Sequence, residues 1–329
     1  MSFNATRSSL FLAALMCLGS AVHLCALTAT NYVAVSGSDT TGDGTSGNPY
    51  ATIQRAVTAT VTGGYVFVGP GTYATGAHTS VPASGYSRVV MTNAITVKSL
   101  EGAAKTIIAG SYPASGSNAV RCVYMSAGLL DGFTLEKGTT DLTAVGDWDA
   151  ARINGGGLFS PRGNRTAVAY NCVITGCLAF SGGGAYWTTL VNCTVVNNNP
   201  LTTRGDGVWS SWVRNSIVYN NGDQNHGSML GAGFPDASIF EYSCTTPLPE
   251  NAVNCISNAP VFVNTTYALS ALSPGVDAGA DALVYSGLDG ARAQRIDGFA
   301  VDLGAYEVQL AKTVESLLQL PSVSGYSNI

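Results

Sequence analysis

The segment Asp147-Trp148-Asp149, with Arg152 close behind it, holds the residues of this chain that are best suited to chemistry. On an extended segment, Asp147 and Asp149 project to the same side, where they could hold a hard cation or act as an acid/base pair. Trp148 could stack on a sugar ring. Arg204 would join these candidate catalytic residues only if the register of a repeat brings it close. The alternative is a solvated loop with a surface salt bridge.

Four aromatic residues form a second candidate site, in which they would bind a substrate. Tyr186 and Trp187 follow one glycine cluster, and Trp209 and Trp212 follow the next. Because Trp187 and Trp209 hold corresponding positions, they would form a vertical stripe. On an outer face, such a stripe would bind a glycan by stacking. Facing inward, it would belong to the core or cover it.

Asp39 and Asp43, in the loop GSDTTGDG, are the candidate metal ligands. Their spacing is typical of calcium ligands, although a full ligand set is missing. Asx turns that hold the loop explain the same residues. Calcium is the only cofactor for which the sequence offers ligands.

The charge of the chain excludes one class of partner. Charged residues make up 11% of the chain, against about 25% in average soluble domains. Without its first 29 residues the chain has 14 basic and 20 acidic residues, and 14 − 20 gives a net charge of −6. No basic patch occurs in the sequence, and we therefore expect no nucleic-acid partner.

The candidate catalytic and aromatic residues lie in or beside a phrase that occurs three times between residues 155 and 221. The copies read GGGLFS…YNCVITGC (155–177), GGGAYWTTLVNCTVVNNN (182–199) and GDGVWSSWVRNSIVYNN (205–221). The glycine clusters are 27 and 23 residues apart. A period of 20 to 50 residues marks a solenoid, and these short β-rich units contain no helical pattern. The repeat therefore predicts an all-β solenoid.

The repeat also predicts ladders of identical side chains. Asn171, Asn192 and Asn215 are 21 and 23 residues apart. Because successive coils lie about 4.8 Å apart, these residues should stack at one turn and share side-chain hydrogen bonds. Cys172 and Cys193 should stack in the same way as buried free thiols, since side chains in register on parallel strands approach poorly for a disulfide.

Residues 1–29 have the pattern of a signal peptide. Arg7 provides a weak positive region, and residues 10–18 form a short apolar run that is followed by small residues. The run is too short to span a bilayer comfortably, which predicts export, cleavage and no transmembrane segment afterwards. Export permits disulfides, and Cys244 and Cys255 bracket a Pro-rich loop as the most plausible pair.

Residues 30–310 are expected to form one solenoid domain. Asn48 as N-cap and Pro49 at the first helical position begin a short amphipathic helix over residues 48–62. Such a helix would cover the core that the first coil exposes. Irregular final coils would close the domain, and residues 311–329 would form a C-terminal tail.

The two ends of the domain resemble a known family. The opening YVAVSGSDTTGDGTSGNPYATIQRAV…VFVGPGTY (32–73) resembles the N-terminal module of bacterial pectin-lyase-like right-handed parallel β-helix proteins. The pieces PVFVN (260–264), LSPGVDAG (272–279) and RIDGFAVDLGAYE (295–307) resemble the C-terminal end of their choice-of-anchor subgroup. The resemblance implies a three-sheet right-handed parallel β-helix and an exported bacterial protein. It implies no single activity, because the scaffold carries lyases, hydrolases and adhesins.

The catalytic patterns of that family are missing here. The chain has no Asp-Asp pair, no Gly-His-Gly and no Arg-x-Lys. We therefore expect a monomeric, secreted or cell-surface protein that binds a polysaccharide or another surface glycan. The alternative is a polysaccharide lyase or glycoside hydrolase that acts on an acidic extracellular polysaccharide, with an atypical site around Asp149, Arg152 and Arg204.

Overall fold

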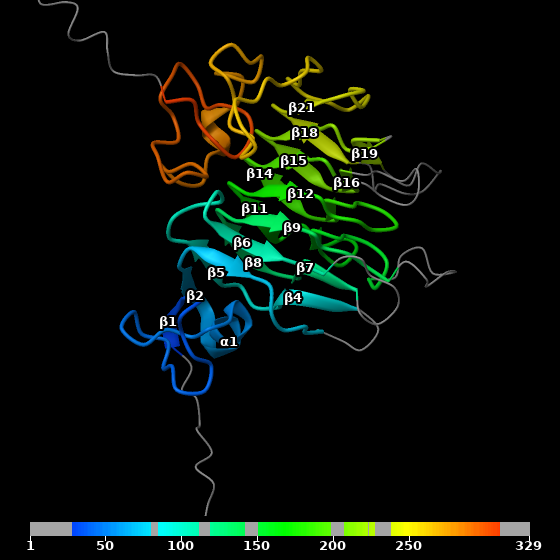
Figure 1. Cartoon of the computed structure of the whole chain (residues 1–329). Helices are drawn as coiled ribbons and strands as arrows, with labels where there is room; N and C mark the ends of the chain where they lie inside the picture. The colour runs from blue at the N-terminus through cyan, green and yellow to red at the C-terminus, as the bar shows by residue number, and fades with distance from the viewer. Residues whose placement is uncertain are drawn as a thin grey trace, which may run out of the picture.

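The chain winds into a right-handed parallel β-helix, as the sequence predicted (Figure 1). The computed structural model describes residues 28–79, 85–111, 119–141, 151–198, 207–222, 224–227 and 238–309. Over these ranges the strands form three parallel sheets, and each full coil gives one strand to sheet 2, then one to sheet 1, then one to sheet 3. The predicted signal peptide and C-terminal tail lie outside the described residues, apart from 28 and 29.

The strands are short, as expected for coils that turn three corners. Sheet 1 contains, in spatial order, β1 (Thr28–Val33), β2 (Thr60–Val68), β5 (Thr96–Ser99), β8 (Gly128–Asp131), β11 (Ala167–Tyr170), β14 (Thr189–Val191), β17 (Trp212–Arg214) and β20 (Ile239–Glu241). Sheet 2 contains β4 (Tyr86–Met91), β7 (Val120–Met125), β10 (Leu158–Phe159), β13 (Ala185–Tyr186), β16 (Val208–Trp209) and β19 (His226–Gly227). Sheet 3 contains β3 (Gly71–Tyr73), β6 (Thr106–Ala109), β9 (Thr134–Glu136), β12 (Val173–Thr175), β15 (Thr194–Val196), β18 (Ile217–Tyr219) and β21 (Cys244–Thr245).

Apolar side chains that point inward stack in register from coil to coil and form the core. On sheet 1 the stack is continuous, and each of its members is fully buried: Val66, Val97, Leu130, Ala169, Leu190, Val213 and Phe240. Burying one such side chain stabilises a fold by about 1.5–3 kcal/mol. The hydrophobic stack thus holds successive coils together, in addition to the backbone hydrogen bonds of the sheets.

The repeated asparagines occupy the first position of the corner between sheets 1 and 3. Asn171, Asn192 and Asn215 have φ values of 54°, 48° and 47°. Asparagine tolerates this left-handed conformation better than most residues, which explains its recurrence. The predicted ladder of shared side-chain bonds is wrong, because their amide groups donate elsewhere: Asn192 to the carbonyl of Asp302, and Asn215 to the carbonyl of Ala280.

Side-chain ladders instead form at the second position of the corners. The Ser216 hydroxyl accepts a hydrogen bond from the backbone N–H of Cys193, one coil earlier (2.9 Å). At the corner between sheets 3 and 2, Asn221 Oδ1 accepts both the backbone N–H (3.1 Å) and the amide Nδ2 (2.9 Å) of Asn198. Asn225 then accepts from the backbone N–H of Asn221 (3.0 Å). An asparagine ladder exists, but at a different corner from the one predicted.

The cysteines are free thiols within the described residues. Cys172 and Cys193 are buried in the core, one coil apart. The predicted disulfide between Cys244 and Cys255 is not formed. The partner of Cys244 across the coils is Ile256, and alternate residues of an extended chain point to opposite faces. Cys255 accordingly packs against the core, whereas Cys244 packs in a cluster outside it.

A short helix, α1 (Ile53–Ala59), covers the N-terminal end of the β-helix, where it packs against β1, β2 and β4 (Figure 1). The predicted bounds were wrong at both ends. Thr52, not Asn48, is the N-cap, and its hydroxyl accepts from the backbone N–H of Arg55. Residues after Ala59 continue into β2, and Asn48 belongs to the preceding loop, where its amide donates to the carbonyl of Thr41.

The chain does not close with irregular final coils. Residues 260–309, called here the C-terminal segment, leave the β-helix and run back along its outside (Figure 1). The carbonyl of Gly290 accepts from the backbone N–H of Ala103, near the N-terminal coils, and Ala280 donates to Asn215 Oδ1, several coils later. The segment therefore crosses several coils on the outside of the β-helix.

The C-terminal segment covers the outer face of sheet 3 with apolar contacts. Val173 packs in a buried cluster with Tyr306, and Ile217 packs in another with Leu303. These outward-facing strand residues would otherwise be exposed to water.

Within the described ranges, no helix has the length and apolar character needed to cross a bilayer.

Candidate functional site

The structure leaves the predicted catalytic cluster untested. Asp147, Trp148, Asp149 and Arg204 lie outside the described residues. Arg152 is described and exposed, and its carbonyl accepts a hydrogen bond from the backbone N–H of Asp141 (2.9 Å). The convergence of these groups stays a prediction.

An aromatic stripe exists on the outer face of sheet 2, but it is buried, and the predicted correspondence of Trp187 with Trp209 is wrong because Trp209 lies in register with Tyr186. Tyr124, Phe159, Tyr186 and Trp209 follow one another in register through β7, β10, β13 and β16. The ring centroids of Phe159 and Tyr186 are 5.3 Å apart and nearly parallel. Only 1% of Tyr186 and 7% of Trp209 is exposed. A sugar cannot reach these rings, so their role as a glycan platform is not supported.

Trp187 and Trp212 pack against arginines. Trp187 is buried, and the guanidinium carbon of Arg165 lies 5.4 Å from its ring centroid. The same carbon is 4.7 Å from the ring of Trp212, and that of Arg214 is 4.8 Å from it. Cation–π contacts of this kind already use the ring faces that a sugar would need. We assign both tryptophans to the stability of the corner between sheets 2 and 1.

Asp39 and Asp43 use their carboxylates to hold their loop. Asp39 Oδ1 accepts from the backbone N–H groups of Ala51 and Thr52, and its Oδ2 accepts from the Thr52 hydroxyl (2.6 Å). Asp43 Oδ1 accepts from the backbone and hydroxyl of Thr45, and the backbone bond is the main cause of its lowered pKa. No group of metal-ligating side chains occurs within the described residues. The turn interpretation fits these contacts, and the calcium interpretation gains no support.

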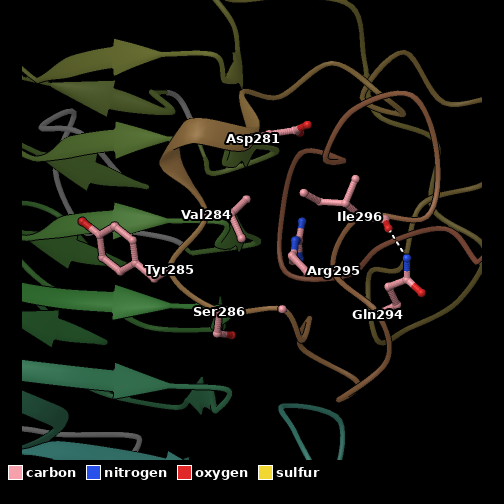
Figure 2. Close-up of a pocket in the computed structure, with 8 residues that line it drawn as sticks. Asp281, Val284, Tyr285, Ser286, Gln294, Arg295 and Ile296 are labelled. Carbon is pink, nitrogen blue, oxygen red and sulfur yellow. Dashed lines mark hydrogen bonds between the residues drawn. The ribbon is translucent and has the colours of Figure 1, made fainter.

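An open pocket of about 500 Å³ lies in the C-terminal segment (Figure 2). Its volume falls within the range of small-ligand sites, about 300–1,000 Å³. It is formed where the 3₁₀ helix η3 (Asp281–Leu283) and the chain after it meet residues 294–296. The residues that line it are Asp281, Val284, Tyr285, Ser286, Gly287, Gln294, Arg295 and Ile296.

The β-helix fixes one wall of this pocket. Tyr170, on β11, donates its hydroxyl to the carbonyl of Ser286 (3.1 Å), and the backbone N–H of Ser286 donates back to that hydroxyl (3.2 Å). The rings of Tyr170 and Tyr285 stack with centroids 5.5 Å apart. Half of Tyr285 remains exposed. An aromatic side chain is thus held in place, with its outer part open to solvent on the side of the chain opposite Arg295 (Figure 2).

Polar side chains at the pocket are oriented by hydrogen bonds to the backbone. Asp281 Oδ1 accepts from the backbone N–H of Val301 (2.8 Å). The Gln294 amide donates to the carbonyl of Ile296 (2.5 Å), as Figure 2 shows. Both side chains are exposed. They therefore present fixed oxygen atoms to a ligand.

A buried ionic network supports the pocket from beneath. The Arg295 guanidinium is fully buried and donates to the carbonyls of Asp302, Gly304 and Ala305. Its Nη2 lies 3.7 Å from Glu307 Oε2. Burial nevertheless outweighs this attraction and raises the pKa of Glu307 from 4.5 to about 7.

We expect the free energy of unfolding to fall as pH rises from about 4.5 to 7, through Glu307. Over this window the folded state keeps a proton on Glu307 that the unfolded state has lost, so raising the pH favours unfolding. The raised pKa of Asp302, also caused mainly by burial, acts in the same direction. Urea unfolding at pH 4.5 and pH 7 should show a smaller difference for Glu307→Gln than for wild type. An unchanged difference would contradict this assignment.

Little in the sequence indicated the pocket residues. Asp281, Tyr285 and Gln294 lie in a stretch without the repeat period, which was expected to form irregular final coils. The available signal was the loss of the period itself, combined with a tyrosine between small and polar residues. It could not identify Tyr170 as the partner that holds the pocket, because 116 residues separate it from Ser286.

Comparisons with known proteins find similarity to solved structures alone. No family model matches the chain, and no curated protein matches it. A rhamnogalacturonan lyase is 16% identical, with a TM-score of 0.40 over 69% of this chain and 56% of that one. Pectin methylesterase PemA from Erwinia chrysanthemi is 13% identical, with a TM-score of 0.39 over 67% and 66%. Pectate lyase Pel9A is 15% identical, with a TM-score of 0.29 over 86% and 97%.

The first two of these proteins are longer than the region matched, since the chain spans less than two thirds of each. The three parallel sheets themselves establish the pectin-lyase-like β-helix fold. Any function of this chain must be argued from its own side chains.

Proposed function

We propose that this protein is a secreted or cell-surface β-helix protein that binds carbohydrate at the pocket of the C-terminal segment. The observations that carry the proposal are the half-exposed ring of Tyr285, on the side of the chain opposite Arg295, and the oriented oxygens of Asp281 and Gln294 (Figure 2). An aromatic ring packs on the C–H face of a sugar, while polar groups beside it bind the hydroxyls. An open and shallow pocket suits a chain that continues beyond the bound sugar units.

The pocket favours binding over cleavage. Glycoside hydrolases generally need two carboxyl groups that flank the scissile bond, about 5 to 9.5 Å apart. Asp281 is the only acidic residue that lines this pocket. The alternative activity, a polysaccharide lyase or glycosidase, would need Asp147, Asp149, Arg152 and Arg204 to converge elsewhere on the molecule.

We expect Tyr285→Ala to weaken carbohydrate binding about tenfold, because the loss of an aromatic contact of about 0.5–1.5 kcal/mol adds to the loss of buried area. Binding should be measured for wild type and variant on a panel of neutral and acidic polysaccharides. The same samples should be assayed for unsaturated products and reducing ends, with and without Ca²⁺.

The matched control is Tyr86→Ala, at a tyrosine of similar exposure on β4. This control should bind as wild type does. If wild type and Tyr86→Ala bind a polysaccharide without cleaving it, and Tyr285→Ala alone fails to bind it, the proposal is supported. Binding that survives Tyr285→Ala, or turnover of any substrate, would overturn it, provided that thermal unfolding shows the variant to be folded.

A further inference from the structure

The C-terminal segment accounts for most of the net negative charge of the chain. Residues 260–309 contain two arginines and six acidic residues, so that 2 − 6 gives a formal charge of −4, against −5 for the whole chain. The pKa of Glu307, raised by burial to about 7, reduces this charge near neutral pH without reversing its sign. Of the charged residues that line the pocket, Asp281 is exposed and Arg295 is fully buried, so the charge that a ligand meets at the opening is that of Asp281.

Both arginines of the segment are already engaged by other groups of the protein, although Arg295 also lines the pocket. Arg292 binds Asp131 through its Nη1 (3.0 Å) and donates to the carbonyl of Ser99 through its Nη2 (2.6 Å). Arg295 is fully buried, and its guanidinium faces three backbone carbonyls and Glu307. Neither guanidinium is placed to pair with an anionic ligand.

Two side chains at the opening offer free acceptor oxygens to the hydroxyls of a ligand. Asp281 uses Oδ1 for the N–H of Val301, and its Oδ2 accepts no hydrogen bond from the described residues. Gln294 uses its amide N–H on Ile296, which leaves its Oε1 as the free end. Ser286 both donates to and accepts from Leu288, so its hydroxyl is committed. The hydroxyls of a ligand can therefore donate to Asp281 Oδ2 and Gln294 Oε1.

We infer that the pocket selects uncharged sugars and rejects uronic acids, an inference that rests on the carbohydrate-binding function proposed above. The hydroxyls of a neutral sugar donate to the free oxygens of Asp281 and Gln294. A uronate replaces a hydroxyl donor with a carboxylate that accepts only, and it places a negative charge beside Asp281. Selection thus arises from unfavourable contacts with the wrong sugar as much as from favourable contacts with the right one.

The test compares oligosaccharides that share one backbone and differ only at C6: a neutral hexose oligomer and the same oligomer oxidised to uronic acids. Wild type should bind the neutral oligomer at least about tenfold more tightly at low salt, because two like charges close together repel strongly when water is partly excluded. Added salt should narrow this gap by screening the charge.

Asp281→Asn keeps an oxygen for Val301 and removes the charge. It should raise the affinity for the uronic oligomer several-fold and change the affinity for the neutral oligomer little. Glu250→Gln, the same carboxyl-to-amide change at an exposed position outside the segment, should change neither.

The outcomes separate the two proposals. Equal or tighter binding of the uronic oligomer, still lost in Tyr285→Ala, would overturn the inference and leave the proposed function standing. The absence of Tyr285-dependent binding to either oligomer would overturn the proposed function. A preference for the neutral oligomer that Asp281→Asn leaves unchanged would also overturn the inference, because Asp281 would then not be the selecting group.

Discussion

Replacement of Arg292 by alanine is expected to destabilise the protein by about 3–5 kcal/mol, the cost of leaving one member of a buried ion pair without its partner. Arg292 binds Asp131 Oδ1 at 3.0 Å and donates to the carbonyls of Asp131 and Ser99. Lys98 Nζ stays 3.2 Å from Asp131 Oδ2, which places the expected loss toward the lower end of this range. The variant should unfold at a lower urea concentration.

Lys105→Ala provides the control for this prediction. Lys105 pairs with Glu101 at 2.9 Å, but both side chains are exposed, and such pairs contribute about 0–1 kcal/mol. The same experiment should therefore show a small change. If Arg292→Ala were no more destabilising than Lys105→Ala, the C-terminal segment would not be held to the early coils by this contact.

The general fold could be predicted from the sequence because the repeat reports local structure. In the corners, the backbone of the first residue must adopt a positive φ, and the side chain of the second residue can form a hydrogen bond with the next coil. Asn197 and Asn198 illustrate this division, since Asn197 has a φ of 55° and Asn198 donates its amide to Asn221. The sequence shows asparagine at both kinds of position. Periodicity alone could not separate the asparagines chosen for backbone conformation from those chosen for side-chain bonding.

The candidate site was less accessible to sequence reasoning, because its contacts join distant parts of the chain. Tyr170 and Ser286, whose hydrogen bonds fix one wall of the pocket, are 116 residues apart, and neither lies in a motif that predicts contact with the other. The aromatic stripe shows a related limit. The sequence left open whether Tyr186 and Trp209 face outward or inward, and periodicity does not report what covers an outer face. Tyr186 and Trp209 point outward and are nevertheless buried. The exposed residues of the pocket lie in the C-terminal segment, where the repeat period is lost.

The core stack of sheet 1 makes the second large prediction. Leu190→Ala is expected to cost about 2–5 kcal/mol, as for other buried leucines. Leu190 is fully buried between Ala169 in the coil before it and Val213 in the coil after it. Because each coil of a solenoid contacts mainly its neighbours, a cavity at Leu190 weakens two interfaces at once.

The matched control is a leucine-to-alanine change at an exposed position, where no cavity forms. Leu272, in the C-terminal segment, is 91% exposed, so Leu272→Ala should change the free energy of unfolding by less than about 0.5 kcal/mol. Urea unfolding of both variants measures the contrast directly. If the two leucines gave similar losses, the stacked core would not be the main source of stability.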